Sequence, residues 1–263
     1  MMKFCNKYSG SRGNLSVIKT PQSTVLVDCG GGASKILPAL SSCGLSPSDI
    51  DAIFVTHEHS DHIGGMETLL SLSPRTKVFV HAKGASAVEE KLQLFNRVNT
   101  FDSAFCFNDL YVDFFECSHD SAFCCGYKLT DEKNKSVAIV TDMGEADEGK
   151  LLSFFAGCNT ILIESNHDVK MVEEGNYPYL LKKRILGNKG HLSNGVAAKI
   201  VAQLPDINVK NVFLGHISLD NNTEEIAFCE SLKQLKARGA TEGRDLNLFV
   251  ARQFVGGKEI NVK

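Results

Sequence analysis

The segment at residues 56–62 restricts what this chain can fold into more than any other. Three histidines and one aspartate fall within six residues, directly after the apolar, β-branched run 52–55, which is typical of a buried strand. Loops that leave the end of a core strand often carry functional side chains. Side chains two apart in an extended segment point the same way, so His57 and His59 can bind one metal ion. Asp61 and His62, further along the bend, can face a second ion; solvated surface histidines are the weaker alternative.

The rest of the chain alternates short apolar strands with helical segments. We predict strands at 15–19, 24–28, 52–56, 77–81, 111–117, 123–129, 137–141, 160–164, 212–215 and 246–251. We predict helices at 34–42, 66–72, 85–94, 148–155, 179–186, 193–204 and 223–238. Ser193 and Thr223 stand in N-cap position for the last two. Early strands that adjoin as in hairpins, followed by strands separated by helices, favour an α+β fold of two mixed sheets with helices outside, in four αββα layers.

Composition sets broad limits on the protein. With 263 residues, 43% of them hydrophobic and 22% charged, the chain is that of a globular protein, and nothing in its composition divides it, so we expect one domain over 1–263. The first residues have no apolar leader and no run approaches the roughly 18 apolar residues of a membrane helix, which predicts a cytoplasmic protein without a membrane partner. The nine cysteines are expected to be reduced thiols, and the net charge of −3 predicts no global attraction to nucleic acid.

Three further ligand candidates each follow an apolar strand: His119, Asp142 and His216. A single histidine at a strand end is usually a hydrogen-bonded structural residue, but several strand ends that all carry His or Asp favour a common site. Together with the residues of the first segment they make seven nitrogen and oxygen ligands. Such a set is sufficient for two divalent ions of the zinc, manganese or iron type.

With these residues the chain resembles the metallo-β-lactamase superfamily of αββα binuclear hydrolases. Asp28, at the end of the run 25–27, matches the aspartate that buttresses the ligands in that superfamily. The segments 9–14, 164–168, 190–194 and 216–222 resemble the bacterial YycJ (WalJ) subfamily, whose members are linked to exonuclease activity on DNA. The resemblance spans nearly the whole chain and implies a cytoplasmic metal-dependent nuclease or phosphodiesterase.

The resemblance also implies an arrangement of ligands. His57, His59 and His119 would hold one ion. Asp61, His62 and His216 would hold the other, with Asp142 bridging the two. A carboxylate can bridge two cations through its two oxygens, whereas an imidazole offers one lone pair to one ion. A bridging hydroxide would then be the nucleophile, because two cations lower the pKa of bound water toward about 7.

The segment 190–194 favours phosphodiesters as substrates. It is similar to a motif of tRNase Z-like phosphodiesterases, in which the histidine contacts the scissile phosphate, so His191 joins Asp61 as a candidate catalytic residue. His191 precedes a predicted helix N-terminus, where free N–H groups favour an anion. The nearby basic run 182–184 and Lys189 are either a rim that binds the nucleic-acid backbone or a solvated helix face.

Several other polar residues are open to two interpretations. His167 either lines the cleft or is a structural residue tied to Asp168. Ser11 and Asn14 lie in a glycine-flanked loop that either approaches substrate phosphate or is a simple hairpin turn. We expect Asp120 to hydrogen-bond a ligand histidine, and His81 to be structural.

We therefore predict a binuclear metallohydrolase, a phosphodiesterase or nuclease of exonuclease type, with nucleic acid as its substrate and DNA favoured over tRNA. A thioesterase or lactonase acting on a small acyl substrate is the first alternative, because its ligands would be much the same. A non-catalytic module that binds nucleic acid or protein is the second. The intact ligand set argues against it.

Overall fold

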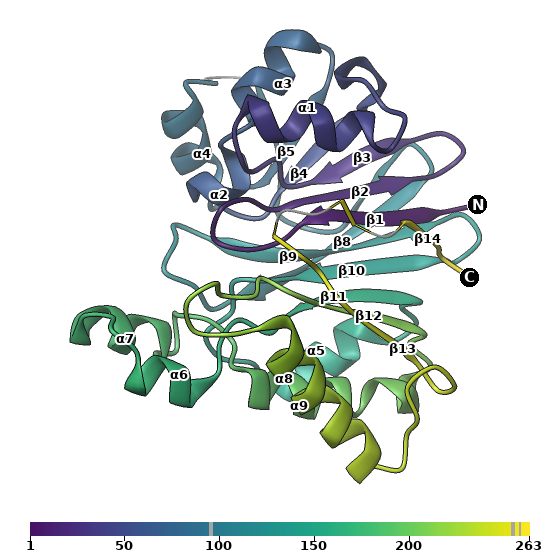
Figure 1. The fold of residues 1–263 in the computed structure, drawn as a ribbon. Helices are drawn as coiled ribbons and strands as arrows, with labels where there is room; N and C mark the ends of the chain where they lie inside the picture. Colours follow the sequence, from purple (N-terminus) through teal and green to yellow (C-terminus); the bar gives the residue numbers. More distant parts are fainter. Residues whose placement is uncertain (95–96, 254–255, 258) are drawn as a thin grey trace.

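Two seven-stranded sheets pack face to face and are covered by helices on their outer sides (Figure 1). The computed structural model describes residues 1–94, 97–253, 256–257 and 259–263. The strands of the first sheet lie in the order β14-β1-β2-β3-β4-β5-β6, and those of the second in the order β13-β12-β11-β10-β9-β8-β7. The first sheet comprises β1 (Lys3–Tyr8), β2 (Leu15–Lys19), β3 (Thr24–Val27), β4 (Ala52–Val55), β5 (Lys77–His81), β6 (Val98–Phe101) and β14 (Glu259–Asn261). The second comprises β7 (Phe105–Phe107), β8 (Leu110–Cys117), β9 (Cys124–Asp131), β10 (Ser136–Val140), β11 (Thr160–Glu164), β12 (Asn211–Gly215) and β13 (Asn247–Val250).

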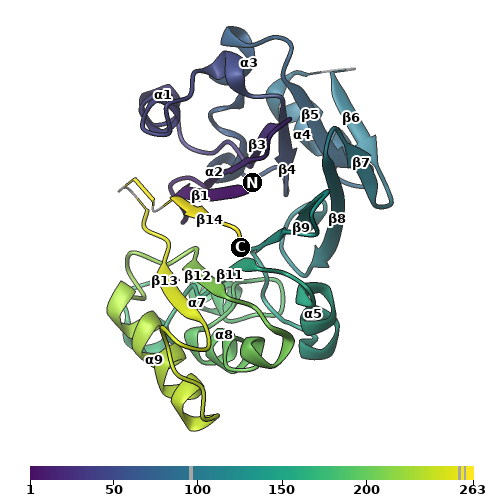
Figure 2. The same cartoon turned by 90° about the vertical axis from the view of Figure 1, so that its right-hand side faces the viewer.

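The helices divide between the two outer faces, as the 90° turn to Figure 2 also shows. The first sheet is covered by α1 (Ala33–Ser41), α3 (Met66–Leu72) and α4 (Ala85–Leu92), with the short α2 (Ser60–Ile63) at its edge. The second is covered by α5 (Glu148–Phe155), α8 (Asn194–Val201) and α9 (Glu224–Ala237). Two further helices, α6 (Val169–Glu174) and α7 (Tyr179–Ile185), project beyond the sheets beside the edge that carries α2. The 3-10 turns are Pro47–Asp49 and Leu204–Ile207.

Alternating side chains explain the four layers. In β3, Val25 and Val27 point into the core between the sheets, whereas Leu26 packs under the helices. In β10, Ile139 faces the same central core and Ala138 faces the outer one. Because both faces are covered, these strands are nearly continuous apolar runs rather than alternating ones. The predicted αββα sandwich is confirmed.

The sheets place the ends of several parallel strands at one edge. Strands β3, β4, β5 and β6 are mutually parallel, and so are β10, β11, β12 and β13. Their carboxyl ends therefore lie along the edge where the two sheets meet α2, α6 and α7 (Figure 1). The predicted ligands follow β4, β8, β10 and β12, so most of them are brought to this edge.

Sequence reasoning placed most α-helices and strands within a few residues but missed six of them, as well as the 3-10 turn Pro47–Asp49. Strands β1, β6, β7 and β14 are short or rich in polar residues, and α6 is a single short helix. The sixth is α2: residues that we expected on a bend form a helical turn that begins directly after His59. The predicted helix 193–204 ends at Val201, and a 3-10 turn containing Pro205 follows, because proline lacks the N–H that continues an α-helix. Ser193 and Thr223 are N-caps, as predicted.

Candidate metal centre

The first half of the site is built by the segment that follows β4. His57 and His62 are buried, and His59 caps the N-terminus of α2 in an extended conformation. The turn of helix directs Asp61 and His62 back toward the strand ends. His62 Nε2 lies 3.4 Å from Asp61 Oδ2, and the rings of His57 and His62 are 4.1 Å apart between centroids. Four nitrogen or oxygen donors thus converge within one short stretch.

The second half is brought in by strand ends with an unusual backbone. Asp142 after β10 and His216 after β12 have positive φ, 60° and 55°, and Asp28 after β3 has a φ of 60°. Side chains other than glycine rarely adopt this left-handed conformation, which costs about 1–3 kcal/mol per residue and recurs at active sites as well as in turns and helix caps. The sharp reversal turns each side chain back over its own sheet edge. These three positions are where the fold accepts strain to aim polar groups inward.

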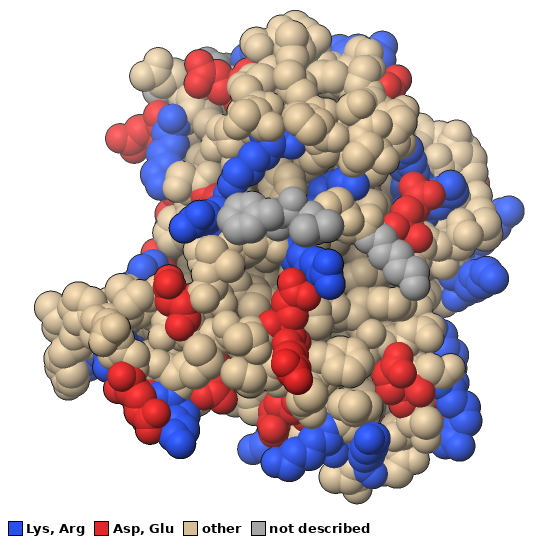
Figure 3. All heavy atoms as spheres, viewed as in Figure 1, with Lys and Arg blue, Asp and Glu red and all other residues tan. Residues whose placement is uncertain are grey.

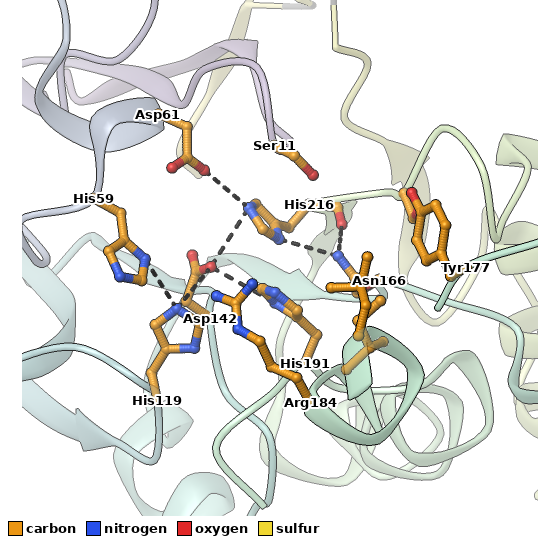
Figure 4. A pocket seen from close by; sticks show the side chains of 13 residues that line it. Ser11, His59, Asp61, His119, Asp142, Asn166, Tyr177, Arg184, His191 and His216 are labelled. Atoms are coloured by element: carbon orange, nitrogen blue, oxygen red, sulfur yellow. Dashed lines mark hydrogen bonds and ion pairs between the residues drawn. The ribbon is translucent and has the colours of Figure 1, made fainter. Parts of the chain in front are cut away.

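The candidate ligands form overlapping groups, and Figure 4 shows those that line the pocket. Ligand atoms of His57, His59 and His119 all lie within 4.8 Å of one another, and the same is true of Asp61, His62 and His216. Asp142 belongs with His57 and His62 in one grouping and with His216 in another. Its Oδ2 is 3.2 Å from His62 Nε2, and its Oδ1 is 3.5 Å from His216 Nε2 and 3.7 Å from His119 Nε2. The structure thus brings all seven predicted ligands together.

The polar atoms of this cluster suit divalent cations. His57 Nε2, His216 Nε2 and Asp142 Oδ2 are buried and have no hydrogen-bond partner among the described residues. Buried polar atoms are otherwise almost always paired, so such atoms call for a ligand. Imidazole and carboxylate donors in these numbers match zinc, manganese or iron.

The pKa values of histidines in the cluster also favour the binding of cations. Burial, together with the neighbouring His62, holds the pKa of His57 well below its usual range, so the ring is neutral and can donate a lone pair. Burial disfavours the charged form of His216, yet Asp142, Asp61 and Glu164 raise its pKa to about 10. The carboxylates therefore attract positive charge to this position, which a cation can supply in place of a proton.

Asp28 lies where a buttress was expected. Its Oδ2 is 2.7 Å from His62 Nδ1, and its Oδ1 accepts a hydrogen bond of 2.9 Å from the backbone N–H of Thr56. With Nδ1 held, Nε2 of His62 is the nitrogen left facing the other ligands. Partners of this kind fix the orientation and tautomer of a ligand histidine.

The loop that contains Ser11 and Asn14 touches the site rather than forming a remote turn. Asn14 Nδ2 lies 3.0 Å from His62 Nε2 and 3.3 Å from Asp61 Oδ2, and the Asn14 backbone N–H donates to the Asp61 carbonyl at 2.7 Å. Ser11 lines the same pocket as the ligands. Gly30 makes room for this approach, since a Cβ there would lie 1.6 Å from the Asp61 carbonyl oxygen.

Glu164 is a functional residue that sequence reasoning missed. Its Oε1 lies 2.9 Å from Nδ1 of His191 and 2.9 Å from Nδ1 of His216, and its Oε2 accepts from the backbone N–H groups of Met143 and Leu192. The carboxylate is fully buried, yet the two histidines lower its pKa to about 2. An acidic residue at the end of the apolar strand β11 was the available signal.

His191 lies at the cavity side of this arrangement. Its ring stacks on that of His216 with centroids 5.1 Å apart, and its Nδ1 is 3.7 Å from Asp142 Oδ1. His191 lines the pocket shown in Figure 4. It therefore reaches the cavity from the side of the second sheet, directly before α8.

Arg184 and Asp120 form the rim of the pocket. Arg184 pairs with Asp120 through Nε and through Nη2, the latter at 3.1 Å from Oδ1. The expected contact of Asp120 with a ligand histidine is also present, at 3.3 Å from His119 Nε2. Of the basic run, Arg184 lines the pocket, whereas the Lys182 ammonium donates to the Glu173 carbonyl at 2.7 Å.

Two other histidines lie away from the pocket. His167 is buried, forms an isolated bridge with Ser193 and does not line the pocket, and burial lowers its pKa to about 4. Its Nδ1 has no hydrogen-bond partner among the described residues, and the Asp168 carboxylate instead caps α6. His81 stacks on Phe123 with centroids 4.0 Å apart, which agrees with the structural role expected for it.

Comparison with known proteins gives the class of this fold and site. A family model described as "Beta-lactamase superfamily domain" matches residues 23–217, and the chain belongs to the metallo-β-lactamase superfamily. "Exodeoxyribonuclease YycJ" from Bacillus anthracis is 34% identical over 239 residues, which is 88% of each chain. "Exodeoxyribonuclease WalJ" from Streptococcus pneumoniae serotype 2 is 32% identical over 247 residues, covering 92% of this chain and 91% of that protein.

A solved structure confirms the fold independently. The metallo-β-lactamase fold protein YhfI from Bacillus subtilis matches with a TM-score of 0.73, at 15% identity and over 98% of both chains. The described part of the chain contains no helix with the length and hydrophobicity needed to cross a lipid bilayer.

Proposed function

We propose that this protein is a binuclear metal-dependent phosphodiesterase that removes nucleotides from the ends of nucleic acid strands, with DNA as its substrate. The observation that carries the proposal is the cluster of overlapping ligand groups around Asp142, with His191 held beside it by Glu164. The relatives named exodeoxyribonucleases, which match about nine-tenths of this chain, support the choice of DNA.

The groupings support a ligand assignment. His57, His59 and His119 would hold one ion and Asp61, His62 and His216 the other, with Asp142 near both His62 and His216 and available to both ions. Two bound divalent ions supply a nucleophile near neutral pH and neutralise charge on the phosphate oxygens. Zinc, manganese and iron all suit these ligands.

The residues around the ligands do the positioning. Because Glu164 engages Nδ1 of His191, Nε2 is the nitrogen available to a phosphate oxygen or to the leaving oxygen. A proton held there can pass to that oxygen as its bond to phosphorus breaks. Arg184, anchored by Asp120 at the rim, adds a positive charge where the polynucleotide backbone enters.

We also propose that this protein acts in the cytoplasm. All nine cysteines are free thiols, and most are buried. Reduced cysteines are typical of proteins that act in the cytoplasm.

The test is cleavage of 5′-phosphorylated single- and double-stranded DNA and RNA, with Mn²⁺ or Zn²⁺ added separately. We expect DNA to be shortened from an end in a metal-dependent way. The His59→Ala protein is the control, and full activity in that protein without metal would contradict the proposal. Inactivity on every nucleic acid, with cleavage of a thioester or a lactone, would favour an acyl hydrolase. Metal binding without turnover on any of these substrates would favour a non-catalytic module.

A further inference from the structure

The pocket that contains the candidate ligands has two chemically different walls. One wall is the polar cluster, from which His59, Asp61, His119, Asp142, His191 and His216 face the cavity. The opposite wall comes from the α6–α7 lobe, residues 169–185, and consists of Tyr177, Leu181 and Ile185 with Arg184 beside them. In Figure 4, Tyr177 lies across the pocket from His59, with His216 and Asn166 between them. A ligand for this pocket therefore carries an anionic group at one end and a flat apolar group at the other.

The lobe presents one defined face to the pocket. Leu181, Arg184 and Ile185 are spaced i, i+3 and i+4 along α7, so they lie on one side of the helix. Tyr179 begins the same helix but does not line the pocket and is 76% exposed. The lobe projects at the lower left of Figure 3, where the surface is hollowed between it and the upper half of the molecule. The apolar wall is thus a continuation of the metal centre rather than a separate patch.

Tyr177 is held in place before any ligand arrives. Its hydroxyl donates to Asp220 Oδ2 at 2.6 Å, which ties the lobe to the loop after β12. An anchored ring loses little conformational entropy when it binds a flat partner. Ser11, Asn166 and Ser218 also line the pocket and offer further hydrogen-bonding groups.

The pocket is small. Its volume is about 240 Å³, below the roughly 300–1,000 Å³ of drug-sized ligand sites, which suits a single nucleotide better than a larger group. Every nucleobase offers a π-face, so stacking on an aromatic ring holds a single strand without selecting its sequence.

We propose that Tyr177, with Leu181 and Ile185, forms a nucleobase subsite that holds the terminal, unpaired nucleotide of a single strand while its phosphate lies at the metal centre. This inference rests on the proposed nuclease function. It adds what that function leaves open, namely that the end of the strand must be unpaired and must carry a base. The subsite is tolerant of base identity but sensitive to base loss.

The experiment compares intact and abasic substrates on the Mn²⁺-loaded enzyme. The variants are Tyr177→Ala, Tyr177→Phe and, as the matched control two residues away at the start of α7, Tyr179→Ala. The substrates are a single-stranded DNA oligonucleotide and the same oligonucleotide lacking its 5′-terminal or its 3′-terminal base. Since stacking contributes about 1–3 kcal/mol per base, Tyr177→Ala should raise KM for the intact strand about 5- to 150-fold, whereas Tyr179→Ala should leave KM unchanged. Tyr177→Phe keeps the ring but loses the hydrogen bond to Asp220, so it should raise KM less than Tyr177→Ala does.

The abasic substrates separate stacking from a general loss of structure. Removing the base at the recognised end should raise KM of the parent enzyme by a similar factor, and Tyr177→Ala should then add no further loss. This arm needs no variant, so it stands even if Tyr177→Ala fails to fold. Cleavage of the intact strand with unchanged KM in Tyr177→Ala, or of the abasic strands with unchanged KM in the parent enzyme, would overturn the subsite while leaving the nuclease function intact. Absence of cleavage of any nucleic acid by the parent enzyme would overturn both.

Discussion

The two halves of the metal centre are built in different ways. Residues 57–62 supply four donors from one strand end and one turn of helix, so their spacing is set by local geometry. Residues 119–216 supply the remaining ligands and the second carboxylate, Glu164, from the ends of four different strands. The first half can form wherever the segment is held at a sheet edge. The second half exists only when the two sheets are packed together.

Backbone strain falls mainly on the second half of the site, whose residues come from separate strand ends between 119 and 216. We call this the dispersed half. Asp142 and His216 both adopt positive φ, whereas no residue from 57 to 62 does. A local motif can reach its geometry through a helical turn, but an isolated residue at a strand end must reverse the chain within itself. Bringing distant side chains to this site therefore requires strained backbone conformations, and the packing of the core has to offset their free-energy cost.

The largest expected effect concerns the residue that joins the halves. Asp142→Ala should remove both ions and lower turnover by at least about 10³-fold, because its carboxylate lies within 3.7 Å of His62, His119 and His216, which come from both ligand groups. His59→Ala should lower turnover as strongly but should leave more metal at the Asp61, His62 and His216 group. Metal analysis of the purified variants, with the exposed Asp102→Ala as control, checks this. Equal retention of metal in Asp142→Ala and the parent protein would contradict the shared role.

The next effect separates chemistry from metal binding in the dispersed half. His191→Ala should keep its metal and lose about 10²–10⁴-fold in kcat, the usual contribution of a positioned acid or base. The same variant should lose one limb of the pH–rate profile. Metal content and the pH dependence of kcat are the measurements, and a variant that loses metal instead would place His191 among the ligands.

A smaller effect is expected from Glu164→Gln, which keeps the shape of the side chain but removes its charge. Glu164 engages both His191 and His216, so metal affinity or activity should fall about 10- to 100-fold. Because Glu164 contacts only residues of the dispersed half, metal should be lost from the group that contains His216 more readily than from the group that contains His57. Glu116→Gln is the control, because Glu116 is an exposed glutamate within β8. If Glu164→Gln had the rate and metal content of the parent protein, the buried charge of Glu164 would be dispensable.

The smallest effect is on stability and concerns His167 in the dispersed half. Its pKa is about 4 in the folded protein because of burial, against an ordinary value of 6.5. The unfolded chain therefore binds the proton more tightly between these values, so the group costs nothing above pH 6.5 and destabilises the fold as pH falls toward 4. Between pH 7.5 and pH 5 this amounts to about 2 kcal/mol of unfolding free energy.

His167→Gln removes this titration. Urea unfolding of both proteins in EDTA at pH 7.5 and pH 5 should show the variant gaining about 2 kcal/mol relative to the parent on acidification. A constant difference between the two proteins at both pH values would mean that His167 is accessible to protons in the folded state.

The outcome for individual residues shows what sequence patterns can predict. The apolar runs at β5 and β11 and the helices α3 and α5 were predicted with their observed bounds, because periodicity and flanking residues suffice for elements with a continuous buried face. The edge strands β6, β7 and β14 were missed, because their identity depends on the neighbour that they pair with rather than on their own composition. Glu164 was overlooked for a related reason: its role is defined by two histidines 27 and 52 residues away.

The sequence by itself determined the chemistry, since four metal-binding side chains in six residues have few other uses, and the strand ends that carry His or Asp indicated that the set was complete. Only the tertiary structure decided how those side chains combine. It brought Asp142 close to His62, His119 and His216, connected His191 to His216 through Glu164, and set Tyr177 across the pocket from His59. The physical reason is that local spacing fixes the directions of neighbouring side chains, whereas distances between strand ends depend on the order and register of two packed sheets.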